Sequence, residues 1–190
     1  MNLTDLLLPT YRQMLRMLRG LLDKAEAQLG SGGAEALLRA RLAPDMFPLA
    51  TQIRFACLQA QEAPLRLLGR RLEQLDELLG EGRNAGEQPG TIAGARARID
   101  EALAFLDGLG PDALDQVPAG DPLVLVLPMS LTFDLTRDQF ARDWAIGQFY
   151  FHLMAAYAIL RKEGIEIGKA DYVPHMFAYL RGPGSPPAQA

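Results

Sequence analysis

The sequence predicts a mostly α-helical protein: a four-helix bundle with a short extra helix and a small β-hairpin before the last long helix. Apolar residues recur at the spacing of a helix face in four long segments. One apolar stretch with β-branched residues interrupts this pattern shortly before the last of them. The chain has 190 residues, 49% of them hydrophobic, which is enough for one core in a single domain. We expect this domain to span residues 1–181.

The first long helix is expected at residues 9–29. Pro9 suits the first turn of a helix, and Gly30 suits its end. A separate short helix is then expected at residues 33–42, where Pro44 stops it.

The second long helix is expected at residues 48–68. Pro64 lies inside it and removes one backbone donor, which predicts a kink or break at residues 61–63. Residues 69–80 are charged and rich in leucine, and they form either a further short helix or an irregular continuation. Residues 80–90 contain four glycines and are expected to be a loop.

The third long helix begins after Thr91, a good N-cap, and keeps its apolar spacing as far as Leu109. Residues 121–134 differ in character, because two apolar runs flank a Pro-Met-Ser turn at residues 128–130. This pattern predicts a hairpin. The hairpin has to pack on the helices, since two strands alone are marginally stable.

The last long helix begins after Thr136 as its N-cap and ends near Gly164. Helical spacing assigns its inner face to Phe140, Trp144, Gln148, Phe151, His152, Ala155 and Ile159. Residues 182–190 are rich in proline and glycine, and we expect them to form a disordered tail.

Composition excludes several classes of protein. The net charge is −4, which gives no support for broad nucleic-acid binding. The single cysteine, Cys57, excludes a disulfide framework within the chain. The first residues lack the regions of a signal peptide, and no apolar run approaches the length of a membrane span. We therefore expect a cytoplasmic protein with no nucleic-acid or membrane partner.

Several stretches resemble an uncharacterised bacterial family of DinB-like helical bundles, known only as a domain of unknown function. The resembling residues are 22–27, 41–49, 149–152, 156–161 and 168–172. The most distinctive stretch begins with Phe149-Tyr150-Phe151-His152. With the order of the helices, the resemblance covers about residues 5–175. It implies the same bundle fold but supplies no activity.

The wider DinB-like superfamily contains metal-dependent enzymes, including thiol S-transferases. In these enzymes the usual metal site has three histidines, one on the second helix and two at H-x-x-x-H spacing on the last helix. Only His152 could match here, because Gln148 and Ala156 stand four residues on either side and the second helix has no histidine. Cys57 or Asp45 would be improvised ligands. Because a metal needs three or four converging ligands, we expect no metal and no cofactor.

His152 is the candidate catalytic residue, and three roles remain open for it: a hydrogen-bonded core histidine, a pocket-lining acid or base, and a metal ligand. An apolar cleft is expected beside it. The expected lining residues are Tyr11, Gln52, Trp144, Gln148, His152 and Tyr157.

Three other polar side chains have both a structural and a functional interpretation. Lys169 either forms an ion pair with Asp171 or a carboxylate such as Asp23, or supplies the rim of an anion site. Asp45 is expected to satisfy the start of the second long helix, as its N-cap or in an Asx-turn, rather than to act as a base. Cys57 is expected to be a buried, inert thiol rather than a nucleophile.

These observations favour a binding or structural module that lacks the three-histidine site, forms a homodimer and accepts a small apolar ligand. Small residues at Ala93, Ala97 and Ala104 would supply a flat dimer face on the third long helix. The alternative is a metal- or thiol-dependent transferase or isomerase that uses His152. A further alternative is a small-molecule or stress sensor.

Overall fold

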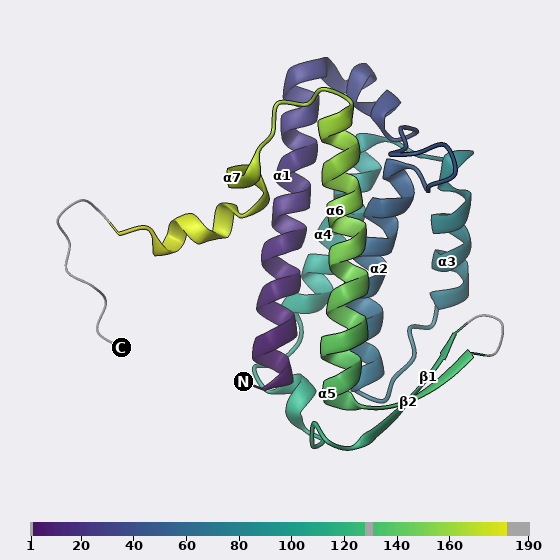
Figure 1. The fold of residues 1–190 in the computed structure, drawn as a ribbon, viewed down its shortest axis with the longest axis vertical. Coiled ribbons are helices and arrows are strands. Elements are labelled where there is room, and N and C mark those ends of the chain that lie inside the picture. Colours follow the sequence, from purple (N-terminus) through teal and green to yellow (C-terminus); the bar gives the residue numbers. More distant parts are fainter. Residues whose placement is uncertain (1, 128–130, 182–190) are drawn as a thin grey trace.

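The structure is a computed structural model that describes residues 2–127 and 131–181 (Figure 1). In chain order it contains α1 (Leu3–Leu37), α2 (Leu49–Leu67), α3 (Leu75–Arg83), η1 (Asn84–Gly86), α4 (Ile92–Asp107), η2 (Ala113–Asp115), β1 (Pro122–Leu127), β2 (Leu131–Thr136), α5 (Arg137–Gln139), η4 (Phe140–Ala145), α6 (Ile146–Lys162), α7 (Lys169–Tyr172) and η5 (Pro174–Tyr179). The expected hairpin turn at 128–130 and the expected disordered tail at 182–190 lie outside the described residues.

The predicted four-helix bundle is confirmed. Figure 1 shows α1, α2 and α6 running side by side along the longest axis, with α4 behind them and α3 on the outer side of α2. Each bundle helix contributes fully or almost fully buried residues to one shared core, such as Leu18, Ile53, Ile99 and Leu153. Burial of these apolar side chains is the main force that holds the helices together. Within the described residues, no helix combines the length and the apolar character that crossing a membrane requires.

Helix α1 begins at Leu3, so the expected start at Pro9 is wrong. The Asn2 side chain accepts a hydrogen bond from the backbone N–H of Asp5 at 2.7 Å. The carboxylate of Asp115 accepts another from the backbone N–H of Leu3 at 2.8 Å. These side chains satisfy donors of the first turn, and one of them comes from a distant part of the chain. Sequence periodicity alone could not supply that partner.

Two of the expected helix breaks differ from the structure. Gly30 adopts a φ of 70°, which favours glycine, and marks a kink after which α1 continues to Leu37. The expected separate short helix is therefore the last part of α1.

Helix α2 passes through Pro64 without interruption, so the expected break at residues 61–63 is wrong. Pro64 deprives the carbonyl of Ala60 of its helical donor, yet one further turn of helix follows the proline.

Helix α3 occupies part of the segment expected to be a loop, because two of its glycines are helical. Gly82 is buried, and a Cβ atom there would lie 2.2 Å from Cε1 of Phe55 in α2. Thr51 of α2 also donates its hydroxyl to the carbonyl of Gly82 at 2.7 Å. The glycine thus allows α3 to approach α2 closely, and this contact overrides the low helix propensity of glycine.

Replacing Gly82 by alanine is expected to lower the free energy of unfolding by about 1–2 kcal/mol, because the new methyl group overlaps Phe55. Gly80 on the same helix is the matched control, since a Cβ there meets nothing within 4 Å. Gly80→Ala should raise the free energy of unfolding by about 0.5–1 kcal/mol through its higher helix propensity. Urea denaturation measures both changes. Equal effects at the two positions would contradict the close contact between α3 and α2.

The predicted hairpin is confirmed as an antiparallel pair, in which Leu125 lies opposite Phe133. Leu125 is 2% exposed and packs into the core, whereas Val124 and Val126 are exposed. The hairpin therefore leans on the bundle, as two isolated strands must to be stable.

The last long helix begins as predicted after Thr136, whose hydroxyl accepts from the backbone N–H of Gln139 at 3.1 Å. The following segment, η4, is π-helical, and the N–H of Ile146 bonds the carbonyl five residues earlier. One extra residue in this turn shifts the phase of the helix face. Phe149 is consequently buried and Phe151 is 58% exposed, so the expected inner face that included Phe151 is wrong at this position.

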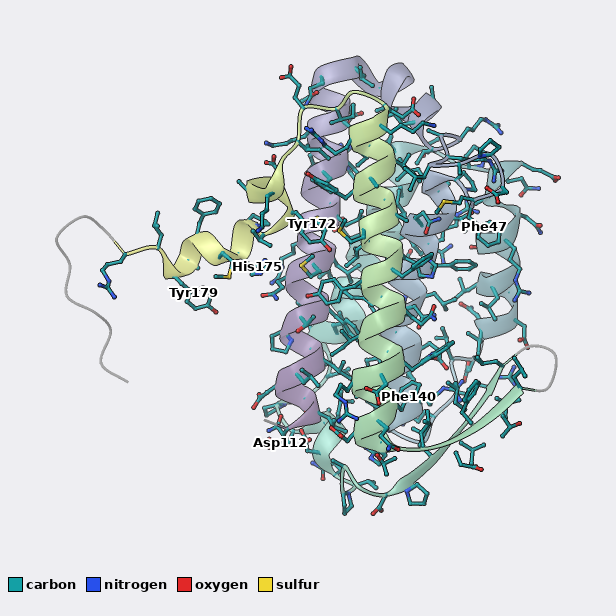
Figure 2. The ribbon with its side chains drawn as sticks, in the orientation of Figure 1. Phe47, Asp112, Phe140, Tyr172, His175 and Tyr179 are labelled. Carbon is teal, nitrogen blue, oxygen red and sulfur yellow. The ribbon has the colours of Figure 1, made fainter. Side chains whose placement is uncertain are left out.

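The C-terminal segment leaves the bundle after α7. Figure 1 shows η5 projecting from the side of α1, and Figure 2 places Tyr179 away from the other helices. The exposed apolar side chains of this segment are Met176, Phe177, Tyr179 and Leu180.

Candidate functional site

Tyr11, Gln148 and Tyr157 were expected to line one cleft, but they lie in different places. Tyr11 is fully buried, with its ring centroid 4.5 Å from that of Phe149. Its hydroxyl has no hydrogen-bond partner among the described residues, and burial raises its pKa. Tyr157 packs against Tyr172 of α7, with 5.4 Å between the ring centroids. Gln148 is half-buried on α6.

His152 and Gln52 form a buried polar pair between α6 and α2. Nδ1 of His152 lies 2.9 Å from Oε1 of Gln52, and Nε2 of Gln52 donates to the carbonyl of Phe47 at 3.1 Å. Figure 2 shows Phe47 on the right side of the molecule, above the hairpin. The imidazole also packs against Phe55 and Phe151, with ring centroids at 5.2 and 5.3 Å. The pair is therefore hydrogen-bonded and enclosed by aromatic rings.

The chemistry of this pair follows from its surroundings. An amide oxygen only accepts, so Nδ1 of His152 carries the proton that bonds Gln52. Burial lowers the pKa of His152 to about 4, because the charged imidazolium is poorly solvated there. His152 is 8% exposed and neutral at pH 7. This geometry is that of a packing contact between two helices.

Lys169 does not form the ion pairs expected for it. Asp171 pairs instead with Lys24 of α1 at 2.5 Å, and this partner lowers the pKa of the Asp171 carboxyl. Asp23 pairs with Arg96 of α4 at 2.7 Å. Lys169 is exposed, and its proposed role at an anion rim stays a prediction.

A cleft of about 280 Å³ lies between α2, α3, the hairpin and the start of the last long helix. Its apolar walls come from Leu58 of α2, Leu75 and Leu79 of α3, and Leu125 of β1. Trp144 closes one side. Trp144 thus lines a cleft, although a different one from that expected beside His152. In Figure 1 this region lies where the hairpin passes below α3.

The same cleft contains a few polar groups. Glu62 accepts from Arg66 one turn later, with 2.7 Å from Nε and 2.5 Å from Nη2 to the same carboxylate oxygen. The Glu62 side chain is only 13% exposed. Oε1 of Gln59 is buried and has no donor within the part of the chain that is described. A polar group of a ligand can therefore meet the Glu62–Arg66 ion pair on otherwise apolar walls.

Comparison with known proteins identifies the family. Residues 3–173 match the family described as a domain of unknown function, DUF1993. The chain belongs to the DUF1993 family. A crystal structure of a DinB family member from Shewanella denitrificans is similar, with a TM-score of 0.71 and 31% identity over 99% of this chain and 95% of that one. No functionally curated protein matches the sequence.

These matches confirm the resemblance to a DinB-like family of unknown function and the fold that it implied. The residues of this DUF1993 domain do not fit the superfamily's three-histidine metal site. Gln52 faces His152 across the bundle and uses its oxygen on the imidazole. No group of three His, Cys, Asp or Glu residues that could hold a metal occurs in residues 2–127 and 131–181.

The improvised ligands considered from the sequence lie elsewhere. Cys57 is fully buried as expected, and burial raises the pKa of its thiol to about 12. Asp45 is exposed, and the N-cap of α2 is Pro48, so the expectation that Asp45 is the N-cap is wrong. Neither side chain is placed to complete a site around His152.

Sequence reasoning missed most of the cleft in this DUF1993 domain. The wall from α3 was unexpected because its glycines resemble those of a loop. Two local signals were present: Leu75 and Leu79 are one turn apart, and so are Glu62 and Arg66. No local signal indicates that these two turns face each other.

Proposed function

We propose that this DUF1993 domain is a binding module that holds a small apolar ligand in the cleft beside Trp144. The observation that carries this proposal is the convergence of apolar walls from α2, α3, β1 and the last long helix on one open cavity. Its volume of about 280 Å³ is close to the lower end of the roughly 300–1,000 Å³ typical of small-molecule sites. A neighbouring hollow of about 500 Å³ shares Glu62, Arg66, Leu75, Leu79 and Val126 with it and extends the available space.

The surroundings of His152 support a binding rather than a catalytic role. Its Nδ1 proton is used by Gln52, its ring is enclosed by aromatic side chains, and it does not line this cleft. A general base needs a pKa near the working pH and access to its substrate. The lowered pKa and the burial of His152 meet neither requirement.

Isothermal titration calorimetry with 1-octanol tests the proposal, because this probe is apolar, uncharged and small enough for the cleft. Burying most of its methylene groups at about 0.8 kcal/mol each predicts a Kd on the order of 0.1 mM. Leu79→Asp places a charge on the apolar wall and should abolish binding.

Met154→Asp is the matched control, because Met154 is 45% exposed on α6 and does not line the cleft. It should leave the Kd unchanged. Absence of heat with the unmodified protein, or an equal loss in both variants, would contradict the proposed site.

We also propose a homodimer through α4, where Ala93, Ala97 and Ala104 are all exposed. Light scattering at micromolar concentration measures the mass. A monomer would contradict this part of the proposal.

A further inference from the structure

We infer that the ligand of this cleft is a single-chain amphiphile with an anionic headgroup. This inference rests on the proposed function and specifies the chemical class of the ligand. The apolar walls described above would take the chain of such a molecule. The charges around the opening of the cleft point to its headgroup.

Basic side chains outnumber acidic ones around the joined hollows. Their charged lining residues are Glu62, Arg66, Arg70, Arg71, Asp76 and Arg83, which are four arginines and two carboxylates. The whole chain has a net charge of −4, so the opening differs in sign from the average of the molecule. A local field of this kind attracts an anion to the cleft.

The arginines differ in how far their charge is already compensated. Arg66 pairs with Glu62, and its guanidinium lies 6.0 Å from the ring centroid of Phe140, which Figure 2 places near the lower end of α6. Arg71 pairs with Asp76 at 2.7 Å.

Arg70 and Arg83 are exposed and have no acidic partner among the residues that the structure describes. They lie towards opposite ends of α3, Arg83 at its last residue and Arg70 in the segment that precedes it. A guanidinium presents a planar fork of donors that matches a carboxylate. These two arginines are therefore the uncompensated cations of the joined hollows, one in each hollow, and each offers a place for an anionic headgroup.

The probes for this inference share one chain length and differ in charge: octanoate, 1-octanol and octyltrimethylammonium. Calorimetry at low ionic strength should show octanoate binding about tenfold more tightly than 1-octanol. The cationic probe should bind more weakly than 1-octanol. The advantage of octanoate should shrink as salt is added, because exposed charges are screened.

Arg70→Gln combined with Arg83→Gln should weaken octanoate binding about tenfold and leave 1-octanol binding unchanged. Arg16→Gln combined with Arg181→Gln removes the same charge from exposed positions outside the cleft and should change neither. Equal binding of octanoate and 1-octanol, or an equal loss in both double variants, would overturn the headgroup assignment. Failure of 1-octanol itself to bind would instead overturn the proposed function.

Discussion

Replacing Arg137 by leucine is expected to lower the free energy of unfolding by about 3 kcal/mol. Arg137 is 6% exposed, and its guanidinium donates to the carbonyl of Leu67 at the end of α2 and to that of Leu114 in η2, the latter at 2.9 Å. Burial lowers its pKa, against the opposing charges of Asp121 and Asp115. Leucine would leave two carbonyls without this donor and two carboxylates without their nearest buried cation.

Arg142 provides the matched control one turn later. Its side chain is 56% exposed, and it pairs with Asp138 and Asp143 at the surface. Exposed ion pairs contribute about 0–1 kcal/mol, so Arg142→Leu should have a small effect. Chemical denaturation of both variants measures the difference. A similar small loss for Arg137→Leu would contradict its role in joining α2, η2 and the last long helix.

Lowering the pH from 7 to 5 is expected to reduce the free energy of unfolding by about 2 kcal/mol through His152 alone. The pKa of His152 is lowered to about 4 by burial, whereas the unfolded chain binds this proton with a pKa near 6.5. The unfolded state therefore gains protons first as the pH falls. The contribution of His152 is fully present above pH 6.5 and is lost progressively towards pH 4.

The variant His152→Asn isolates this effect, because asparagine offers an amide donor near the position of Nδ1 but does not titrate in this range. Its stability should change by about 2 kcal/mol less between pH 7 and pH 5 than that of the unmodified protein. The carboxyls of Asp115 and Asp171 also have lowered pKa values, but they lose their contribution mainly below pH 4. The same pH dependence in both proteins would contradict the neutral, buried state of His152.

Local signals in the sequence predicted local structure well. Thr91 and Thr136 cap their helices as expected, because the bonded N–H lies only three residues further on. The hairpin and the four apolar faces likewise follow from short-range patterns. Contacts between distant segments account for the predictions that are wrong, such as the start of α1 and the loop expected at α3. Asp115 starts α1 from far along the chain, and Phe55 fits against Gly82.

In the candidate site, too, the errors of prediction come from contacts between distant segments. The sequence assigned His152 and Gln52 to the wall of one cleft, and the structure brings these two side chains together. It placed Trp144 beside them, but the π-helical turn that precedes α6 changes which residues face inward. The cleft walls depend on α3 and β1, whose packing on α2 no periodicity in the sequence specifies.

The fluorescence of Trp144 tests the central claim most directly, because it is the only tryptophan of the chain and it lines the proposed cleft. During titration with 1-octanol, its emission should shift to shorter wavelength as the ligand displaces water. The shift should saturate with the same midpoint as the calorimetric titration and be absent in Leu79→Asp. Unchanged emission at a concentration that saturates the calorimetric signal would show that the ligand binds elsewhere.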